Sequence, residues 1–181
     1  MAELTWVDGQ ETLADIVRPG LDLLFVGYNP SLPAIARRQY YGNPANAFWK
    51  ELHACGLVPA FYGTPGDDVR VLDHGIGITD VVKRPTATSR ELAKGEYLAG
   101  FARLSALVAE YRPRTVCFVG VDLLRRYEAQ AARFPADIAV TAVYSTSGLA
   151  NGYWRERREG FARLAASLGR RESLQTASGL R

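Results

Sequence analysis

The sequence predicts an α/β fold, a three-layer α/β/α domain built on a central, mainly parallel sheet. Three short apolar runs have the length and composition of strands buried on both faces, at residues 21–26, 115–120 and 138–144. Segments of helical character follow or separate these runs, at residues 88–112, 122–132 and 153–168. Strands that alternate with helices favour a parallel sheet covered on both faces. We expect one domain over residues 1–168 and a polar, mobile tail over residues 169–181.

The first third of the chain supplies the first strand and a predicted helix. Gly27 ends the first apolar run, and residues 31–41 show no clear period, so we expect a loop there. Asn43 followed by Pro44 predicts a helix start, with asparagine as the N-cap and proline at the first helical position. Gly56 is placed to end that helix.

The middle of the chain supplies a further extended segment and a long helix. Residues 75–82 are rich in glycine and β-branched side chains, which predicts a short strand or an irregular extended segment. Thr88 and Glu91 match a capping box, so we expect a helix to run from there to about Arg112. Pro113 ends it, because proline cannot continue a helix.

Bulk properties place only loose limits on function. The chain has 181 residues, 48% of them hydrophobic and 23% charged, which is ordinary for a globular protein with a sizeable core. A net charge of +3 is compatible with nucleic-acid binding but indicates it weakly. Cys55 and Cys117 lack a Cys-x-x-Cys spacing, so we expect buried free thiols. His53 and His74 are the only histidines, which argues against a zinc site.

The sequence favours a cytoplasmic protein, associated with the nucleoid if its source is bacterial. The first residues lack the basic and apolar regions of a signal peptide. No apolar stretch approaches the length needed to span a membrane, so we expect no membrane partner.

Three short segments carry most of the functional information. Residues 27–31 read Gly-Tyr-Asn-Pro-Ser, residues 41–49 read Tyr-Gly-Asn-Pro-Ala-Asn-Ala-Phe-Trp, and residues 145–149 read Ser-Thr-Ser-Gly-Leu. Loops at the ends of two strands can converge on one crevice of an open α/β sheet. The first segment lacks the glycines of a dinucleotide fingerprint and the lysine of a P-loop. The residues alone therefore predict a site at Asn29 for a planar polar ligand or a developing anion.

Together these segments resemble the active-site motifs of the mismatch-specific uracil/thymine DNA glycosylases, within the uracil-DNA glycosylase superfamily. The family motifs are Gly-Ile-Asn-Pro-Gly, a Phe-Ala-His-Pro-Ala-Asn-Arg-Phe-Trp type segment, and Asn-Pro-Ser-Gly-Leu-Ser-Arg. Residues 77–82 and 84–86 also look like a family segment, and the similarity extends over about residues 21–164. The resemblance implies hydrolysis of the N-glycosidic bond of a damaged or mismatched pyrimidine flipped out of the duplex. It implies no metal and no cofactor.

The resemblance also implies roles for individual residues. Asn29 matches the family asparagine that positions the attacking water; an Asx-turn residue before Pro30 is the alternative, and both roles can coexist. The Tyr41 ring is expected to stack on the flipped base, and backbone N–H groups near Tyr28 and Tyr41 to hold its carbonyl oxygens. The full set of expected base-binding residues is Gly27, Tyr28, Tyr41, Gly42 and Ser145.

Asp80 departs from the familiar bacterial members, which carry lysine at this position. A carboxylate there can deprotonate water or stabilise an oxocarbenium-like sugar, work that an amide cannot do. The alternative is a surface or capping aspartate.

The second motif implies contacts with the duplex. Gly148 and Leu149 fit the family wedge that fills the space left by the flipped base. Ser145 replaces the family asparagine, and Asn151 stands where an arginine contacts the opposite strand, which puts recognition of the orphaned guanine in doubt. Further DNA contacts are expected from arginines that flank the loops, namely Arg37, Arg38 and Arg84.

The predicted function is therefore that of a monofunctional DNA glycosylase, a monomer that acts on double-stranded DNA with uracil chiefly opposite guanine. Hypoxanthine, thymine or an etheno-adduct of cytosine remain alternative substrates. A non-catalytic lesion binder and an enzyme of free nucleosides are the alternatives from other functional classes.

Overall fold

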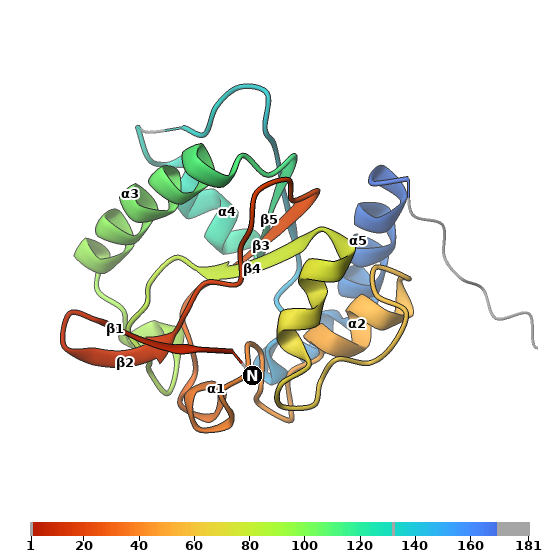
Figure 1. Ribbon diagram of the computed structural model, residues 1–181, viewed down its shortest axis with the longest axis horizontal. Helices are drawn as coiled ribbons and strands as arrows, with labels where there is room; N and C mark the ends of the chain where they lie inside the picture. The colour runs from red at the N-terminus through yellow and green to blue at the C-terminus, as the bar shows by residue number, and fades with distance from the viewer. Residues whose placement is uncertain (1, 132, 170–181) are drawn as a thin grey trace, which may run out of the picture.

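The computed structural model describes residues 2–131 and 133–169, and its centre is a four-stranded parallel sheet between helices (Figure 1). The strands lie in the spatial order β4 (Ile76–Asp80), β3 (Leu23–Gly27), β5 (Thr115–Val119) and β6 (Ala139–Val143). All three pairings are parallel. The predicted three-layer α/β/α fold is confirmed. Beyond Gly169, the predicted tail lies outside the described residues.

Alternate residues of the central strand enter two separate cores. Leu23 and Phe25 pack on one face, together with side chains of α2 (Phe48–Ala54) and α5 (Trp154–Ser167). Leu24 and Val26 pack on the other face with α3 (Lys94–Tyr111) and α4 (Val121–Glu128). Figure 1 shows these two pairs of helices on opposite sides of the sheet. Both faces of β3 are therefore buried, as its uninterrupted apolar run predicts.

A β-hairpin that the sequence analysis did not predict precedes the sheet. Strands β1 (Leu4–Val7) and β2 (Gln10–Leu13) pair antiparallel. Their turn is formed by Asp8 and Gly9, which have φ angles of 51° and 76°. Asp-Gly between two extended segments is a strong hairpin signal, because both turn residues need positive φ. The hairpin signal was therefore present in the sequence.

Two boundary predictions are wrong in the segment after β3. Residues 31–41 are not all loop, because α1 (Leu32–Arg37) lies within them; the Ser31 hydroxyl accepts its N-terminal capping bond from the Ala34 amide at 3.3 Å. Helix α2 begins at Phe48 rather than at Pro44. The Asn43 side chain instead accepts from the Ala45 amide at 2.9 Å, an Asx-turn that competes with helix formation.

The capping box at Thr88 is present, but it caps a single 3₁₀ turn, η2 (Ser89–Glu91). Leu92 is extended and buried, so the predicted helix is interrupted there and α3 begins only at Lys94. Two further 3₁₀ segments are η1 (Asp68–His74) and η3 (Gly148–Tyr153). The remaining predicted strands and helices agree with the structure to within a few residues.

Two of the general expectations are tested by the fold. Cys55 and Cys117 are both free and buried, as expected. Within residues 2–131 and 133–169, no helix combines the length and the apolar character needed to cross a membrane.

Candidate active site

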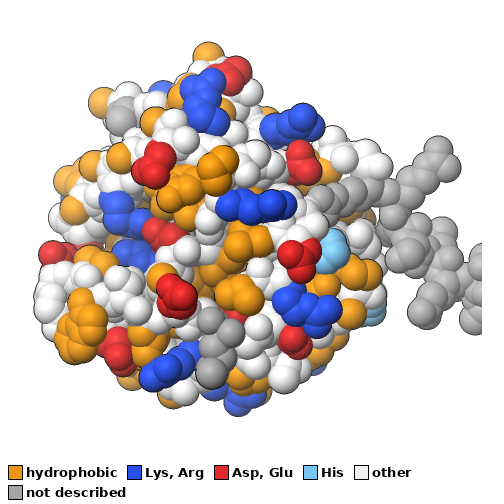
Figure 2. Space-filling model, in the orientation of Figure 1, with side chains coloured by type: hydrophobic (Ala, Val, Ile, Leu, Met, Phe, Trp, Pro, Cys, Tyr) orange, Lys and Arg blue, Asp and Glu red, His pale blue; other side chains and the backbone are white. Residues whose placement is uncertain are grey.

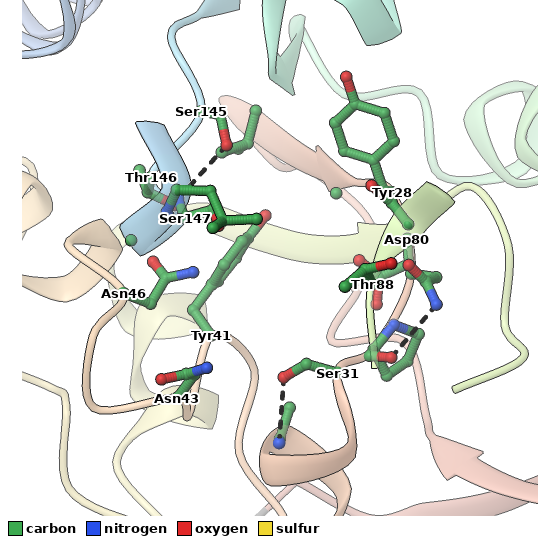
Figure 3. Close-up of a pocket in the computed structure, with 18 of the residues that line it drawn as sticks. Tyr28, Ser31, Tyr41, Asn43, Asn46, Asp80, Thr88, Ser145, Thr146 and Ser147 are labelled. Carbon is green, nitrogen blue, oxygen red and sulfur yellow. Dashed lines mark hydrogen bonds between the residues drawn. The ribbon is translucent and has the colours of Figure 1, made fainter. Parts of the chain in front are cut away.

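The carboxyl ends of all four parallel strands open into one cavity of about 560 Å³. Gly27 contributes from β3, Asp80 from β4, Val119 from β5 and Ser145 from the loop after β6. Figure 3 shows the segment that carries Tyr41 meeting the loop of Ser145 across this space. The predicted convergence of separate loops on one crevice is thus observed at the sheet edge where α/β proteins usually bind ligands.

Asn29 is fixed by the loop that follows β4. Its Nδ2 atom donates to the Arg84 carbonyl at 2.8 Å and to the Thr86 hydroxyl at 2.7 Å. Among the described residues, no donor bonds its Oδ1 atom. Asn29 lines the cavity, so its amide oxygen is available to accept a hydrogen bond from a bound water. The amide also donates to the Pro30 carbonyl at 3.3 Å. An Asx-turn would instead have the side-chain oxygen accept from a backbone N–H, and no such bond is found among the described residues.

Asp80 lies in the wall of the cavity and is only 3% exposed. It pairs in register with Gly27 of β3. A Cβ atom built on Gly27 would lie 2.3 Å from Asp80 Oδ1, so glycine is needed there for the carboxyl group to occupy its place. Its Oδ2 atom is buried without a hydrogen-bond partner. The alternative of a surface aspartate is therefore wrong.

A buried ionic network lies behind Asp80. Lys83 donates from Nζ to Asp15 Oδ1 at 2.8 Å and to the Tyr40 hydroxyl at 2.9 Å. Arg103 donates to the other oxygen of Asp15 at 2.6 Å and also to the Asp80 carbonyl. The network thus ties the N-terminal segment and α3 to the end of β4, with two cations, Lys83 and Arg103, sharing the carboxylate of Asp15.

Burial raises the pKa of Asp80 to about 7, because little water remains to stabilise the carboxylate. The negative charge of Asp15 adds to this rise, whereas Lys83 and Arg103 oppose it. An acid with a pKa near the pH of the cell can exchange protons with a reacting water at either stage of a reaction. Strongly shifted groups in a cleft are also typical of functional sites.

Tyr41 is held in a strained backbone conformation, with φ of 54°. Its ring stacks on Phe48 with ring centroids 3.8 Å apart and an interplanar angle of 19°. Its hydroxyl is buried without a partner and lies 3.2 Å from the Cβ position built on Gly27, beside Asp80. Burial raises the pKa of this hydroxyl well above its usual value, so it keeps its proton and can donate.

Tyr28 lines the cavity on the side of Gly120. Its ring lies against Gly120, where a Cβ would be 2.8 Å from the ring. Figure 3 shows the hydroxyl pointing away from Tyr41 and Asp80. Ser145 and Ser147 lie across the cavity, and the Ser147 amide donates to the Ser145 hydroxyl at 3.3 Å.

Comparison with known proteins places this arrangement in a family. Residues 14–169 match the model of the uracil DNA glycosylase superfamily. The chain belongs to this superfamily. The solution NMR structure of a candidate uracil DNA glycosylase from Methanosarcina acetivorans has the same fold, with a TM-score of 0.63 and 22% sequence identity. That match covers 87% of this chain and 97% of the archaeal one.

Membership of the uracil DNA glycosylase superfamily indicates a DNA glycosylase, which hydrolyses an N-glycosyl bond of a base in DNA. The cavity suits such chemistry in its polar groups, since it offers an oriented amide, a carboxyl group and backbone N–H groups. Among the residues that the structure describes, no cluster of three or more His, Cys, Asp or Glu side chains could hold a metal ion.

Gly148 and Leu149, the residues of the predicted wedge, line the same cavity. Gly148 packs closely on the segment before α2, since a Cβ there would lie 3.1 Å from the Ala45 side chain. The Leu149 side chain is 85% exposed, and its amide donates to the Ser147 hydroxyl at 3.4 Å. The predicted wedge role needs an exposed apolar side chain, and Leu149 has one.

Five of the predicted site residues lie outside the cavity. Gly42 is buried, and a Cβ there would lie 2.8 Å from the Gln39 carbonyl oxygen, so it shapes the turn rather than the lining. Asn151 lines a neighbouring hollow. Arg37 and Arg38 are exposed at the end of α1.

Arg84, another expected DNA contact, has an ion-pair partner within the protein. It is engaged by Glu96, with Nε 2.6 Å from one carboxylate oxygen, and it faces a different cavity. Its sequence position gave no sign of this partner on α3. On the face that Figure 2 shows, basic and acidic side chains are interspersed, so charge alone does not mark a DNA surface there.

Several residues that line the cavity were not among the predicted site residues. They are mostly small polar residues of the loops, together with one arginine: Ser31, Asn43, Asn46, Thr86, Thr88, Ser89, Arg90, Thr146 and Ser147. Asn43 and Asn46 lie within the motif already singled out, and their Asx-turns were the available signal. The network of Asp15 and Arg103 had no sequence signal, because its members lie 88 positions apart.

Proposed function

We propose that this protein is a monofunctional DNA glycosylase that removes uracil, chiefly from G:U mismatches, after flipping it into the cavity beside Asp80. The observation that carries the proposal is the placement of Asn29 and Asp80 on one cavity wall, at the ends of two paired strands. An oriented amide and a carboxyl group of raised pKa are the two groups that activation of a water needs.

In the proposed reaction, a water is held by the Asn29 amide oxygen and attacks the sugar carbon C1′. The N-glycosidic bond breaks, and its electron pair leaves with uracil as a delocalised anion. Asp80 takes the proton of the attacking water and, as a carboxylate, stabilises the oxocarbenium-like sugar. Backbone N–H groups of Tyr28 and Tyr41 donate to the uracil oxygens as negative charge develops there. The ring of Tyr41, backed by Phe48, provides the stacking surface for the base.

The reaction ends at an abasic site because a bifunctional mechanism needs an accessible amine. The chain has three lysines, Lys50, Lys83 and Lys94. None is among the described residues that line the cavity, and Lys83 is buried in the network with Asp15. We therefore expect no strand cleavage by the enzyme itself.

Single-turnover excision on duplexes with G:U, A:U, G:T or hypoxanthine, followed by alkaline cleavage, tests the proposal. Preferred release of uracil from G:U, with strand breaks only after alkali, would support it. Faster release of hypoxanthine or thymine would show that uracil is not the preferred substrate. Tight lesion binding with no release from any duplex would overturn the glycosylase and favour a non-catalytic binder.

A further inference from the structure

A second hollow of about 420 Å³ lies next to the glycosylase cavity and has a different lining. It is formed by the segment before α2, by α2 itself and by the first turn of α5. Asn46 lines both spaces, and Gly148 packs on Ala45 between them. The hollow is therefore within a short reach of any nucleotide that enters the first cavity.

The lining of this hollow carries more positive than negative charge. Lys50, Arg157 and Arg158 face it together with a single carboxylate, Glu51. Both oxygens of Glu51 are already engaged, by Arg157 Nε at 3.1 Å and by Arg158 Nε at 2.6 Å. Among the described residues, Lys50 forms no ion pair. The hollow thus offers positive charge that the protein itself does not neutralise.

Arg157 gives the second observation that points to a ligand. Its side chain is 94% buried, an unusual place for arginine unless its donors are satisfied. Its Nη1 atom is nevertheless without a hydrogen-bond partner in the protein. A buried donor without an acceptor is unfavourable, and an anionic oxygen in the hollow would supply the acceptor.

The rim of the hollow adds an aromatic surface. Trp154 is 53% exposed, and the Arg155 guanidinium lies 5.3 Å from its ring centroid. Half-exposed aromatic rings beside cationic side chains are typical of surfaces along which a nucleic-acid strand runs. A DNA strand carries one phosphate for about every 3.4 Å of helix axis, so neighbours of the flipped nucleotide must pass close by.

We propose that this hollow binds a backbone phosphodiester of the DNA substrate, with Lys50 and Arg158 as its outer contacts and Arg157 as its buried donor. The inference rests on the proposed function only in taking DNA as the ligand. It separates two tasks on the two sides of the Gly148 turn, with the base held on one side and the backbone on the other.

Salt-dependent binding to a duplex with one 2′-fluorinated deoxyuridine opposite guanine, whose glycosidic bond resists hydrolysis, tests the proposal. The salt slope is the slope of the logarithm of the binding constant against the logarithm of the salt concentration. For Lys50→Ala we expect about tenfold weaker binding at low salt and a salt slope smaller in magnitude by about one unit. Lys50→Glu should lose more, and Lys50→Arg should restore the parent slope. Arg163→Ala, an exposed arginine elsewhere on α5, is the matched control and should keep the parent slope.

Unchanged affinity and slope in both Lys50→Ala and Lys50→Glu would overturn the proposal, as would an equal loss in Arg163→Ala. A single-stranded oligonucleotide with the same lesion identifies the strand: a slope change there assigns the phosphate to the damaged strand, and a change in the duplex alone assigns it to the opposite strand. Uracil release at saturating enzyme is measured in parallel. If the unmutated protein binds with the expected salt slope but releases no base, the proposed glycosylase activity is wrong and the proposed phosphate site is still supported.

Discussion

Replacing Asp80 by asparagine should stabilise the fold at neutral and alkaline pH. The raised pKa of about 7, against an ordinary value of 3.8, means that the folded state holds the proton of Asp80 more tightly than the unfolded chain does. Below pH 3.8 Asp80 is protonated in both the folded and the unfolded state, so its burial as a carboxylate does not lower the free energy of unfolding. The penalty grows as pH rises through this window and is complete above pH 7, where about three pKa units correspond to about 4 kcal/mol.

The asparagine variant removes this penalty because it is neutral at every pH. The difference in unfolding free energy between Asp80→Asn and the parent should be near zero at pH 4 and should approach about 4 kcal/mol at pH 8. Urea unfolding at a series of pH values measures it. The matched control is Asp73→Asn, an exposed aspartate of η1, for which the difference should stay near zero throughout.

The same variant should lose catalysis in a way that depends on pH. Single-turnover excision by the parent should rise with pH through about 7, as Asp80 becomes the carboxylate that accepts a proton. Above pH 7, excision by Asp80→Asn should be slower by roughly 10² to 10⁴. Its rate should show no rise with pH near 7, because asparagine does not ionise, and the variant should still bind duplex. An asparagine variant that is no more stable than the parent at pH 8, and equally active, would refute the reasoning for both roles.

Three further substitutions test other parts of the site. Gly27→Ala should abolish excision and cost about 1–3 kcal/mol of stability, measured by urea unfolding, because its Cβ would displace the Asp80 carboxyl group; an active, stable variant would contradict this. Asn29→Ala should slow single-turnover excision roughly 10²-fold with unchanged duplex affinity, and a loss confined to binding would exclude a role in orienting water. Leu149→Ala should leave stability within about 0.5 kcal/mol but slow excision from duplex by tenfold or more, and an equal loss on single strands would argue against the wedge.

The sheet could be predicted because local patterns specify it. The runs at 21–26 and 115–120 are buried on both faces, and each forms a strand at nearly the expected place. The run at 138–144 also forms a strand, but β6 lies at the sheet edge and its first two residues are exposed, so the predicted burial of both its faces is wrong. Helix boundaries were less predictable where side chains compete for backbone groups. Asn43 forms an Asx-turn instead of capping a helix. Leu92 interrupts the predicted helix because its side chain is buried in the core while its backbone is extended.

The candidate site was predictable only as far as its motifs reach. The resemblance brought Asn29, Tyr41 and Leu149 to attention, and the structure places all three around one cavity. It could not give the partner of Arg84, because Glu96 becomes its neighbour only through the packing of α3. Long-range ionic pairs leave no periodic trace in a sequence, which is why the network behind Asp80 was also missed.

The site concentrates the features that lower stability elsewhere in a protein. Asp80 and Tyr41 each bury an oxygen without a partner, and the Tyr41 backbone adopts positive φ without being glycine. Each departure is unfavourable in the free protein, and each lies where a substrate would be bound or activated in the proposed reaction. The surrounding structure must therefore hold them in place, and the register of Gly27 with Asp80 and the ionic network of Lys83 do so from two sides. Substitutions that stabilise the free protein most should therefore cluster at this cavity and should reduce its activity.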